Sequence, residues 1–165
     1  PFGFPQQIVY DRTALLGDAA GMVKATTGGG IIMSICAANI LSEAIHKTHV
    51  KKNYTIQQMK KTYQRKFHRR LGLELRIHYL IRLFLLKMTP EEFENIFHLY
   101  LHTSVRHIIQ KYADMDFPLK LLLNLLKNRN FIRFCSKLLL NHIRLVYPVF
   151  KTIFLCRSTE LRDLS

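Results

Sequence analysis

The pattern of apolar and polar positions predicts β-structure in a short N-terminal segment and helices in the long remainder of the chain. The apolar triplets 8–10 and 14–16 flank the polar residues 11–13, a pattern that predicts two short strands around a turn. Residues 31–44 mix small and large apolar side chains, which predicts a buried helix that packs closely against its neighbours.

The helical remainder begins after a polar, basic segment at 46–53, which we expect to be a connection between helices. Thr55 and Gln58 have the spacing of a capping box, in which a hydroxyl and a side chain three residues later satisfy free amides at a helix start. The apolar pattern then continues past Gly72 towards Lys87. One long helix is therefore predicted here.

A stronger helix start lies at residues 89–92, where Thr89 can cap, Pro90 fits the first turn and Glu92 can bond back. The helix it opens is predicted to end near Leu101. Further helices are predicted over Ser104–Tyr112, Pro118–Lys127 and Phe131–Val146. The predicted fold class is an α+β fragment that is mostly α.

Two glycine motifs provide the clearest chemical signal. Gly17-Asp18-Ala19-Ala20-Gly21 follows the second predicted strand, and the TTGGG run at 26–30 opens the first predicted helix. Glycines let a ligand approach the backbone, and the start of a helix presents unpaired N–H groups with a partial positive charge. Together with the Asp18 carboxylate, this arrangement suits a phosphate-rich or anionic cofactor.

At this spacing the two motifs resemble the second flavin-binding motif of FAD-dependent oxidoreductases related to p-hydroxybenzoate hydroxylase, and among these the geranylgeranyl reductase family. In that family the Asp binds the ribityl and pyrophosphate part of FAD, and the glycine loop lies along the isoalloxazine ring. Ala25 stands where many relatives have a proline, so we expect a less rigid loop. The resemblance implies that FAD is bound by Gly17, Asp18, Ala19, Gly21, Lys24, Thr27, Gly28, Gly29 and Gly30.

Flavoproteins of this class hold the adenine half of FAD on an N-terminal Rossmann-type βαβ unit with a G-x-G-x-x-G fingerprint, and no such pattern follows a strand here. We therefore expect the C-terminal part of a longer enzyme that, alone, binds FAD poorly or not at all. Residues 1–46 are expected to complete the FAD-binding domain. Residues 47–165 are expected to form a basic helical domain.

The formal net charge of +14 is unevenly distributed. Residues 1–46 carry Arg12 and Lys24 against Asp11, Asp18 and Glu43, so the excess lies in the helical part. Such a surface favours phosphate-bearing partners, either anionic lipids or nucleic acid.

Leucine-rich stretches lie among these charges, at 83–86, 119–126 and 138–140, and suit a membrane interface. The sequence has no recognisable nucleic-acid-binding motif, and a solvated basic face is the plain alternative. No apolar run reaches the roughly 18–20 residues that span a bilayer. With no signal peptide and three cysteines that form no metal or redox motif, the prediction is a cytoplasmic, peripheral membrane protein without a nucleic-acid partner.

Other chemistry has weaker support. His98 and His102 have the i, i+4 spacing of a helical metal site, but no third ligand is evident, and surface histidines are the simpler interpretation. Ser34 and Cys36 lie in an apolar helix without a base at a suggestive spacing, so nucleophilic catalysis is not predicted. No catalytic residue is assigned.

The primary hypothesis is an FAD-dependent reductase that saturates isoprenoid (geranylgeranyl) double bonds. Its partners would be a prenylated lipid substrate, an anionic membrane surface and an unidentified electron donor. Two alternatives stay open: another flavoprotein of the same superfamily, such as a monooxygenase, halogenase or quinone-linked dehydrogenase, or a non-catalytic, truncated helical protein on a membrane surface.

Overall fold

A computed structural model of the chain describes residues 7–143, which are mostly helical and contain two short strands. The coarse prediction, mostly α with a little β, is thereby confirmed. Contacts divide the chain into two compact units, Pro1–Tyr79 (unit 1) and Leu80–Ser165 (unit 2). The predicted division at residue 46 concerns cofactor binding rather than packing, and it stays a prediction.

Unit 1 begins with a small antiparallel hairpin of β1 (Val9–Tyr10) and β2 (Thr13–Ala14), in which Val9 pairs with Ala14. The Leu15 amide extends the pairing by donating to the Ile8 carbonyl at 2.8 Å. The hairpin was predicted, but its second strand ends at Ala14 instead of Leu16. A 3-10 turn, η1 (Gly17–Ala20), follows within a few residues.

The first long helix, α1 (Ile31–Val50), extends beyond its predicted end at Ala44, so the expected polar connection from residue 46 was wrong. Thr48 is buried, and its hydroxyl donates to the Ala44 and Ile45 carbonyls, which lets this polar residue stay within the helix. The helix stops just before Lys52, whose φ of 49° is left-handed. The prediction of a buried helix holds for one face only, since Ile31, Ile32 and Ile35 are exposed.

The predicted long helix is built from five consecutive helical segments and opens at Thr55, whose hydroxyl accepts from the Gln58 amide at 3.3 Å. Two of its turns are π-helical, which no sequence pattern predicted. The segments are α2 (Ile56–Met59), η2 (Lys60–Gln64), α3 (Arg65–Phe67), η3 (His68–Gly72) and α4 (Leu73–Leu85). The last residues of α4, from Leu80 on, belong to unit 2.

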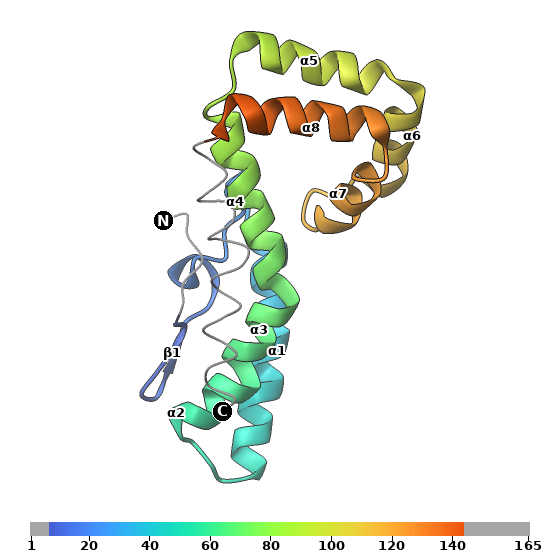
Figure 1. The fold of residues 1–165 in the computed structure, drawn as a ribbon. Coiled ribbons are helices and arrows are strands. Elements are labelled where there is room, and N and C mark those ends of the chain that lie inside the picture. Colours follow the sequence, from blue (N-terminus) through green and yellow to red (C-terminus); the bar gives the residue numbers. More distant parts are fainter. Residues whose placement is uncertain (1–6, 144–165) are drawn as a thin grey trace. The chain divides into compact units, whose positions relative to one another are not determined.

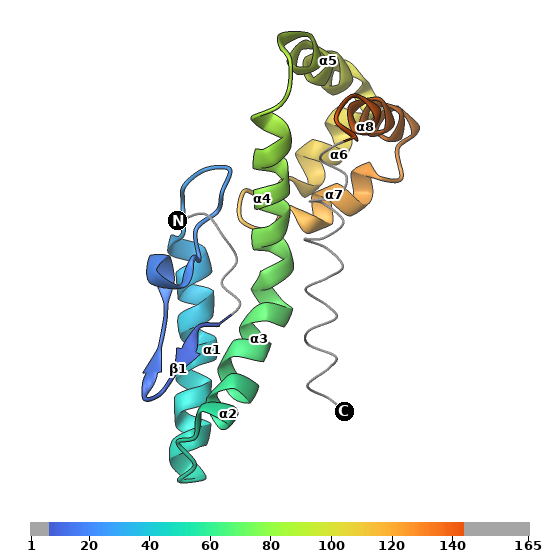
Figure 2. The same cartoon turned by 60° about the vertical axis from the view of Figure 1, so that its left-hand side comes forward.

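The core of unit 1 lies where this helix packs on α1 and the hairpin, as Figure 2 shows. Tyr63 and Phe67 are fully buried there, together with Met22 and Met33. The Tyr63 hydroxyl donates to the Leu15 carbonyl at 2.7 Å, and burial raises the pKa of Tyr63 to about 12. These contacts fix the segment that leads into the glycine turn.

Unit 2 is a set of shorter helices, namely α5 (Pro90–Leu101), α6 (Thr103–Tyr112), α7 (Leu119–Leu125) and α8 (Arg129–Asn141). Here α5 packs on α8, and α6 packs on α7 (Figure 1). The capping box at Thr89 is present with both of its hydrogen bonds, as predicted. The last predicted helix ran to Val146, which lies outside the described residues.

Candidate functional site

The glycine turn that follows the hairpin is held by its own backbone. The Gly21 amide donates to the Asp18 carbonyl at 2.9 Å, and the Met22 amide donates to the Gly17 carbonyl at 3.1 Å. Ala20 is buried, whereas the side chains of Asp18 and Ala19 are exposed. The turn is therefore fixed by backbone hydrogen bonds, and the Asp18 carboxylate lies at its surface.

The second glycine motif is a closed loop anchored at Lys24. The Lys24 amide donates to the Gly29 carbonyl and the Gly28 amide donates to the Lys24 carbonyl, both at 2.9 Å. The Lys24 side chain is buried along Gly29. At the tip, Gly28 has a left-handed φ of 73° and nothing within 4 Å of where a Cβ would stand, so this part of the loop is open.

Turn and loop meet at Gly30. A Cβ on Gly30 would stand 2.8 Å from the Met22 carbonyl oxygen and 3.3 Å from a carboxylate oxygen of Asp18. Only glycine fits there without a shift of the backbone. This close approach places the Asp18 carboxylate beside the start of α1.

Gly30 caps α1 without a side-chain hydrogen bond, and the first amide bonded along the helix is that of Ser34, which donates to the Gly30 carbonyl at 2.8 Å. Amides ahead of that position carry the positive end of the helix dipole. Ile31, which is 76% exposed, and Ile32 add apolar surface at the same end. The arrangement offers a hydrogen-bond acceptor for hydroxyls, amides for an anionic edge and an apolar rim for a flat ring.

Of the predicted cofactor-binding residues, Asp18 and Gly30 lie together, and Thr27 and Gly28 form the exposed loop tip. Gly17 lies beside Ser34. Gly21 and Lys24 have backbone roles in closing the turn and the loop, and Gly29 lies beside Lys24.

Sequence reasoning missed one partner of this loop, the buried His78 of α4. Its Nδ1 lies 2.7 Å from the Thr26 hydroxyl. The contact joins positions 52 residues apart in the chain. No local spacing marks such a pair, so the sequence offered no signal for it.

Unit 2 contains a groove of about 650 Å³ between α5 and α8, lined among others by His98, His102, Arg133 and Lys137. Among residues 7–143, no group of three or more His, Cys, Asp or Glu side chains could hold a metal ion. His98 and His102 thus lie in a groove, both exposed, with no third ligand from this part of the chain.

The buried Glu92 also lines this groove. Asn141 donates to the Glu92 carboxylate at 2.9 Å, His142 Nε2 lies 2.9 Å away, and the Thr89 amide donates at 2.9 Å. These hydrogen bonds lower the pKa of Glu92 from 4.5 to about 2. The cluster joins the start of α5 to the end of α8.

Comparison with known proteins gives one distant relative and no family. An uncharacterized protein from Methanocaldococcus jannaschii is 27% identical over 128 residues, which covers 78% of this chain and 32% of that protein. The chain thus spans about a third of that relative's length. No protein-family model matches the chain, and no solved structure matches it. Within residues 7–143, no helix has both the length and the apolar character needed to cross a bilayer.

Proposed function

We propose that this chain is part of an FAD-dependent oxidoreductase that reduces isoprenoid double bonds, with residues 17–30 contacting the flavin. The observation that carries the proposal is the close approach of the turn and the loop at Gly30. A Cβ placed on Gly30 would lie 3.3 Å from a carboxylate oxygen of Asp18. A carboxylate and free helix amides side by side suit a ligand with both hydroxyls and an anionic edge. The ribityl chain and isoalloxazine ring of FAD have these features.

Each residue has a definite task in this proposal. Asp18 accepts hydrogen bonds from ribityl hydroxyls, and the amides at the start of α1 stabilise negative charge on the ring. The open tip at Gly28 lets the ring approach the backbone, while Ile31 and Ile32 exclude water from its edge. Reduced FAD, when bound, would supply a hydride to one alkene carbon, and a proton from a separate donor would complete the saturation.

The substrate class follows from the resemblance to geranylgeranyl reductases and from the basic, leucine-rich helices that follow the loop. A prenylated lipid is the proposed substrate, an anionic membrane surface the proposed location, and a separate electron donor completes the reaction. Because the chain spans about a third of its relative, the remaining contacts to FAD are assigned to residues outside it.

The test uses the product of the complete gene and measures bound flavin by its visible absorbance per protein. Asp18→Ala is expected to weaken FAD binding roughly 10- to 100-fold, because charge-assisted hydrogen bonds to hydroxyls are lost. Helix content by circular dichroism should not change, since Asp18 is exposed. Asp11→Ala, which removes an exposed carboxylate from the hairpin turn, is the matched control.

Gly28→Ala gives a second, independent test because nothing in the protein occupies the space of the new methyl group. Because the φ of residue 28 is positive, alanine there should cost about 1–2 kcal/mol of stability. The new methyl group would also occupy the space next to the loop and displace a flavin bound there. A wild-type protein without flavin, or unchanged flavin content in both variants, would overturn the proposal and favour the non-catalytic alternative.

A further inference from the structure

One stretch of unit 1, residues 44–73, contains no Asp or Glu at all. Its cations are Lys47, Lys51, Lys52, Lys60, Lys61, Arg65, Lys66, Arg69 and Arg70. By contrast, the described part of unit 2 mixes its Lys and Arg with Glu91, Glu92, Glu94, Asp114 and Asp116. The positive charge of the chain is therefore concentrated on one segment.

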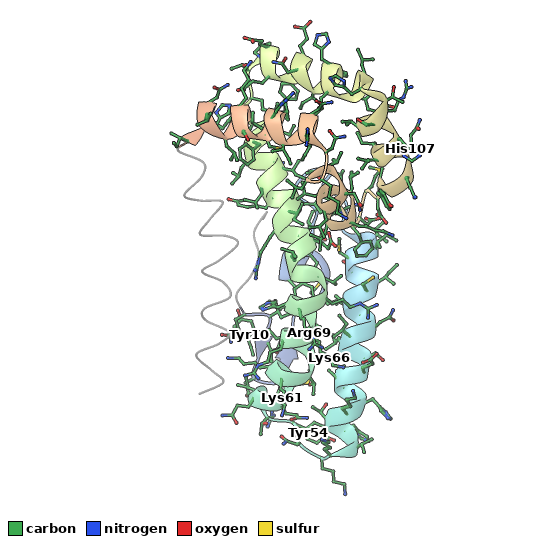
Figure 3. All side chains as sticks on the ribbon, turned by 45° about the vertical axis from the view of Figure 1, so that its right-hand side comes forward. Tyr10, Tyr54, Lys61, Lys66, Arg69 and His107 are labelled. Atoms are coloured by element: carbon green, nitrogen blue, oxygen red, sulfur yellow. The ribbon has the colours of Figure 1, made fainter. Side chains whose placement is uncertain are left out.

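The structure gathers part of this segment at one end of unit 1, where α1 turns into α2. We call this end the basic tip and define it by Lys47, Lys51, Lys52, Lys60 and Lys61. Figure 3 shows Tyr54 and Lys61 at this end. All of these lysines except the half-buried Lys60 are exposed.

Three apolar side chains stand among the lysines of the basic tip. Val50 is 67% exposed, Tyr54 64% and Ile56 37%. Exposed apolar side chains among cations are typical of surfaces that dip into a lipid headgroup layer. The tip thus offers both kinds of contact that a bilayer surface can satisfy.

The tip is held in shape by hydrogen bonds. The Asn53 amide donates to the Thr48 carbonyl at 3.0 Å, and Asn53 Oδ1 accepts from the Thr55 hydroxyl at 2.8 Å. The Tyr54 hydroxyl lies 3.1 Å from His49 Nδ1. Binding therefore need not order the turn first, which removes an entropic cost.

An apolar groove of about 660 Å³ continues from the tip along unit 1, between the hairpin and α1. Ile45, Tyr54, Ile56 and Met59 line it on the helical side, and Tyr10 lines the hairpin side. Tyr54 and Ile56 belong to both the tip and the groove. The apolar surface is therefore continuous from the lysines to the groove. A phospholipid would need such a surface, because its phosphate would contact the lysines while its acyl chain contacts the groove.

We propose that the basic tip docks unit 1 on the surface of an anionic phospholipid bilayer, with Val50, Tyr54 and Ile56 entering the headgroup layer and the groove receiving acyl-chain contacts. Lysines alone would also fit nucleic acid, but the exposed apolar residues and the apolar groove favour lipid. This inference rests on the proposed membrane lipid substrate and assigns the surface that reaches it.

The charge test measures cosedimentation of the complete gene product with vesicles of equimolar phosphatidylcholine and phosphatidylglycerol, and with phosphatidylcholine alone. Binding is expected only to the anionic vesicles. The K51Q/K52Q variant should bind them roughly 30-fold more weakly, because each lysine near the surface contributes roughly fivefold. The matched control is K120Q/K127Q, which removes two exposed lysines from unit 2 and should bind as the wild type does.

The apolar test uses Tyr54→Ser, with Tyr100→Ser as the matched exposed tyrosine of unit 2. Tyr54→Ser should weaken vesicle binding roughly tenfold and remove the part of the binding that persists in high salt. Bound flavin is measured in the same samples and should be unchanged in all four variants. If the wild-type protein contains no flavin but still binds anionic vesicles, the proposed function is contradicted and the docking proposal is not.

Three results would overturn the docking proposal: equal binding to neutral and anionic vesicles, wild-type vesicle binding by both tip variants, or binding to a duplex oligonucleotide that exceeds vesicle binding and is lost in K51Q/K52Q. The last result would assign the tip to nucleic acid instead.

Discussion

The two units use similar apolar side chains in different ways. In unit 1, Tyr63, Phe67 and Leu71 are buried on the long helix, whose η2 and α3 segments pack on α1. Met33 of α1 and Ile8, just before β1, are fully buried as well. In the described part of unit 2, the buried apolar residues are Val105, Pro118 and Leu125, and α8 buries none. Unit 1 therefore has a larger apolar core than the described part of unit 2, in which hydrogen bonds to Glu92 join α5 to α8.

The largest expected effect separates two phenylalanines. Phe67→Ala should lower the free energy of unfolding by about 3–5 kcal/mol, because it leaves a cavity in a closed core. Phe97→Ala in unit 2, where the side chain is 70% exposed, should cost less than about 0.5 kcal/mol. Urea denaturation followed by circular dichroism measures both, and similar losses would erase the contrast between the units.

The hydrogen bonds to Glu92 should make the stability of unit 2 depend on pH. With the pKa lowered from 4.5 to about 2, the charged carboxylate stabilises the fold fully above pH 4.5, and this contribution is lost as the pH falls towards 2. Glu92→Gln should cost about 1.5–3 kcal/mol at neutral pH, because hydrogen bonds to a charged acceptor are replaced by weaker ones.

Thermal melts at a series of pH values measure the effect, and Glu92→Gln should have a flatter pH profile than the wild type. Glu91→Gln, an exposed neighbour beside the same groove, serves as the control. A wild-type profile in Glu92→Gln would mean that the cluster does not hold α5 to α8.

A smaller effect is expected at the polar contact within the core of unit 1. Tyr63→Phe keeps the ring but leaves the Leu15 carbonyl without its 2.7 Å donor, and should cost about 1–2 kcal/mol. Tyr100→Phe, at an exposed position of α5, should have no measurable effect in the same denaturation experiment. Equal stability of the two variants would show that packing alone fixes the hairpin.

Local signals predicted much of this fold. The Thr89 capping box, the hairpin and the helix start at Thr55 each depend on residues within a few positions, and all three are present. The end of α1 was misjudged because Thr48 returns its hydrogen bonds to the helix instead of to solvent. Polar sequence on an exposed face does not end a helix.

Long-range features could not be predicted in the same way. The turn and loop of the candidate site were found from their glycines, but the contact between Thr26 and His78 and that between Tyr63 and Leu15 join distant positions. The leucine-rich runs of unit 2 have the composition of a core, yet burial depends on which neighbours close over each helix, and a single sequence does not record that.

The two π-helical turns of unit 1 determine which side of the long helix faces inwards. Tyr63, Phe67, Leu71 and Leu75 are all buried and recur every fourth residue, a spacing that on a regular α-helix drifts about 40° per step around the axis. The wider turns at Lys60–Gln64 and His68–Gly72 offset this drift and keep the four residues in one row. Deleting one residue from either turn would rotate everything after it by about 100°, and His78 would then point away from Thr26.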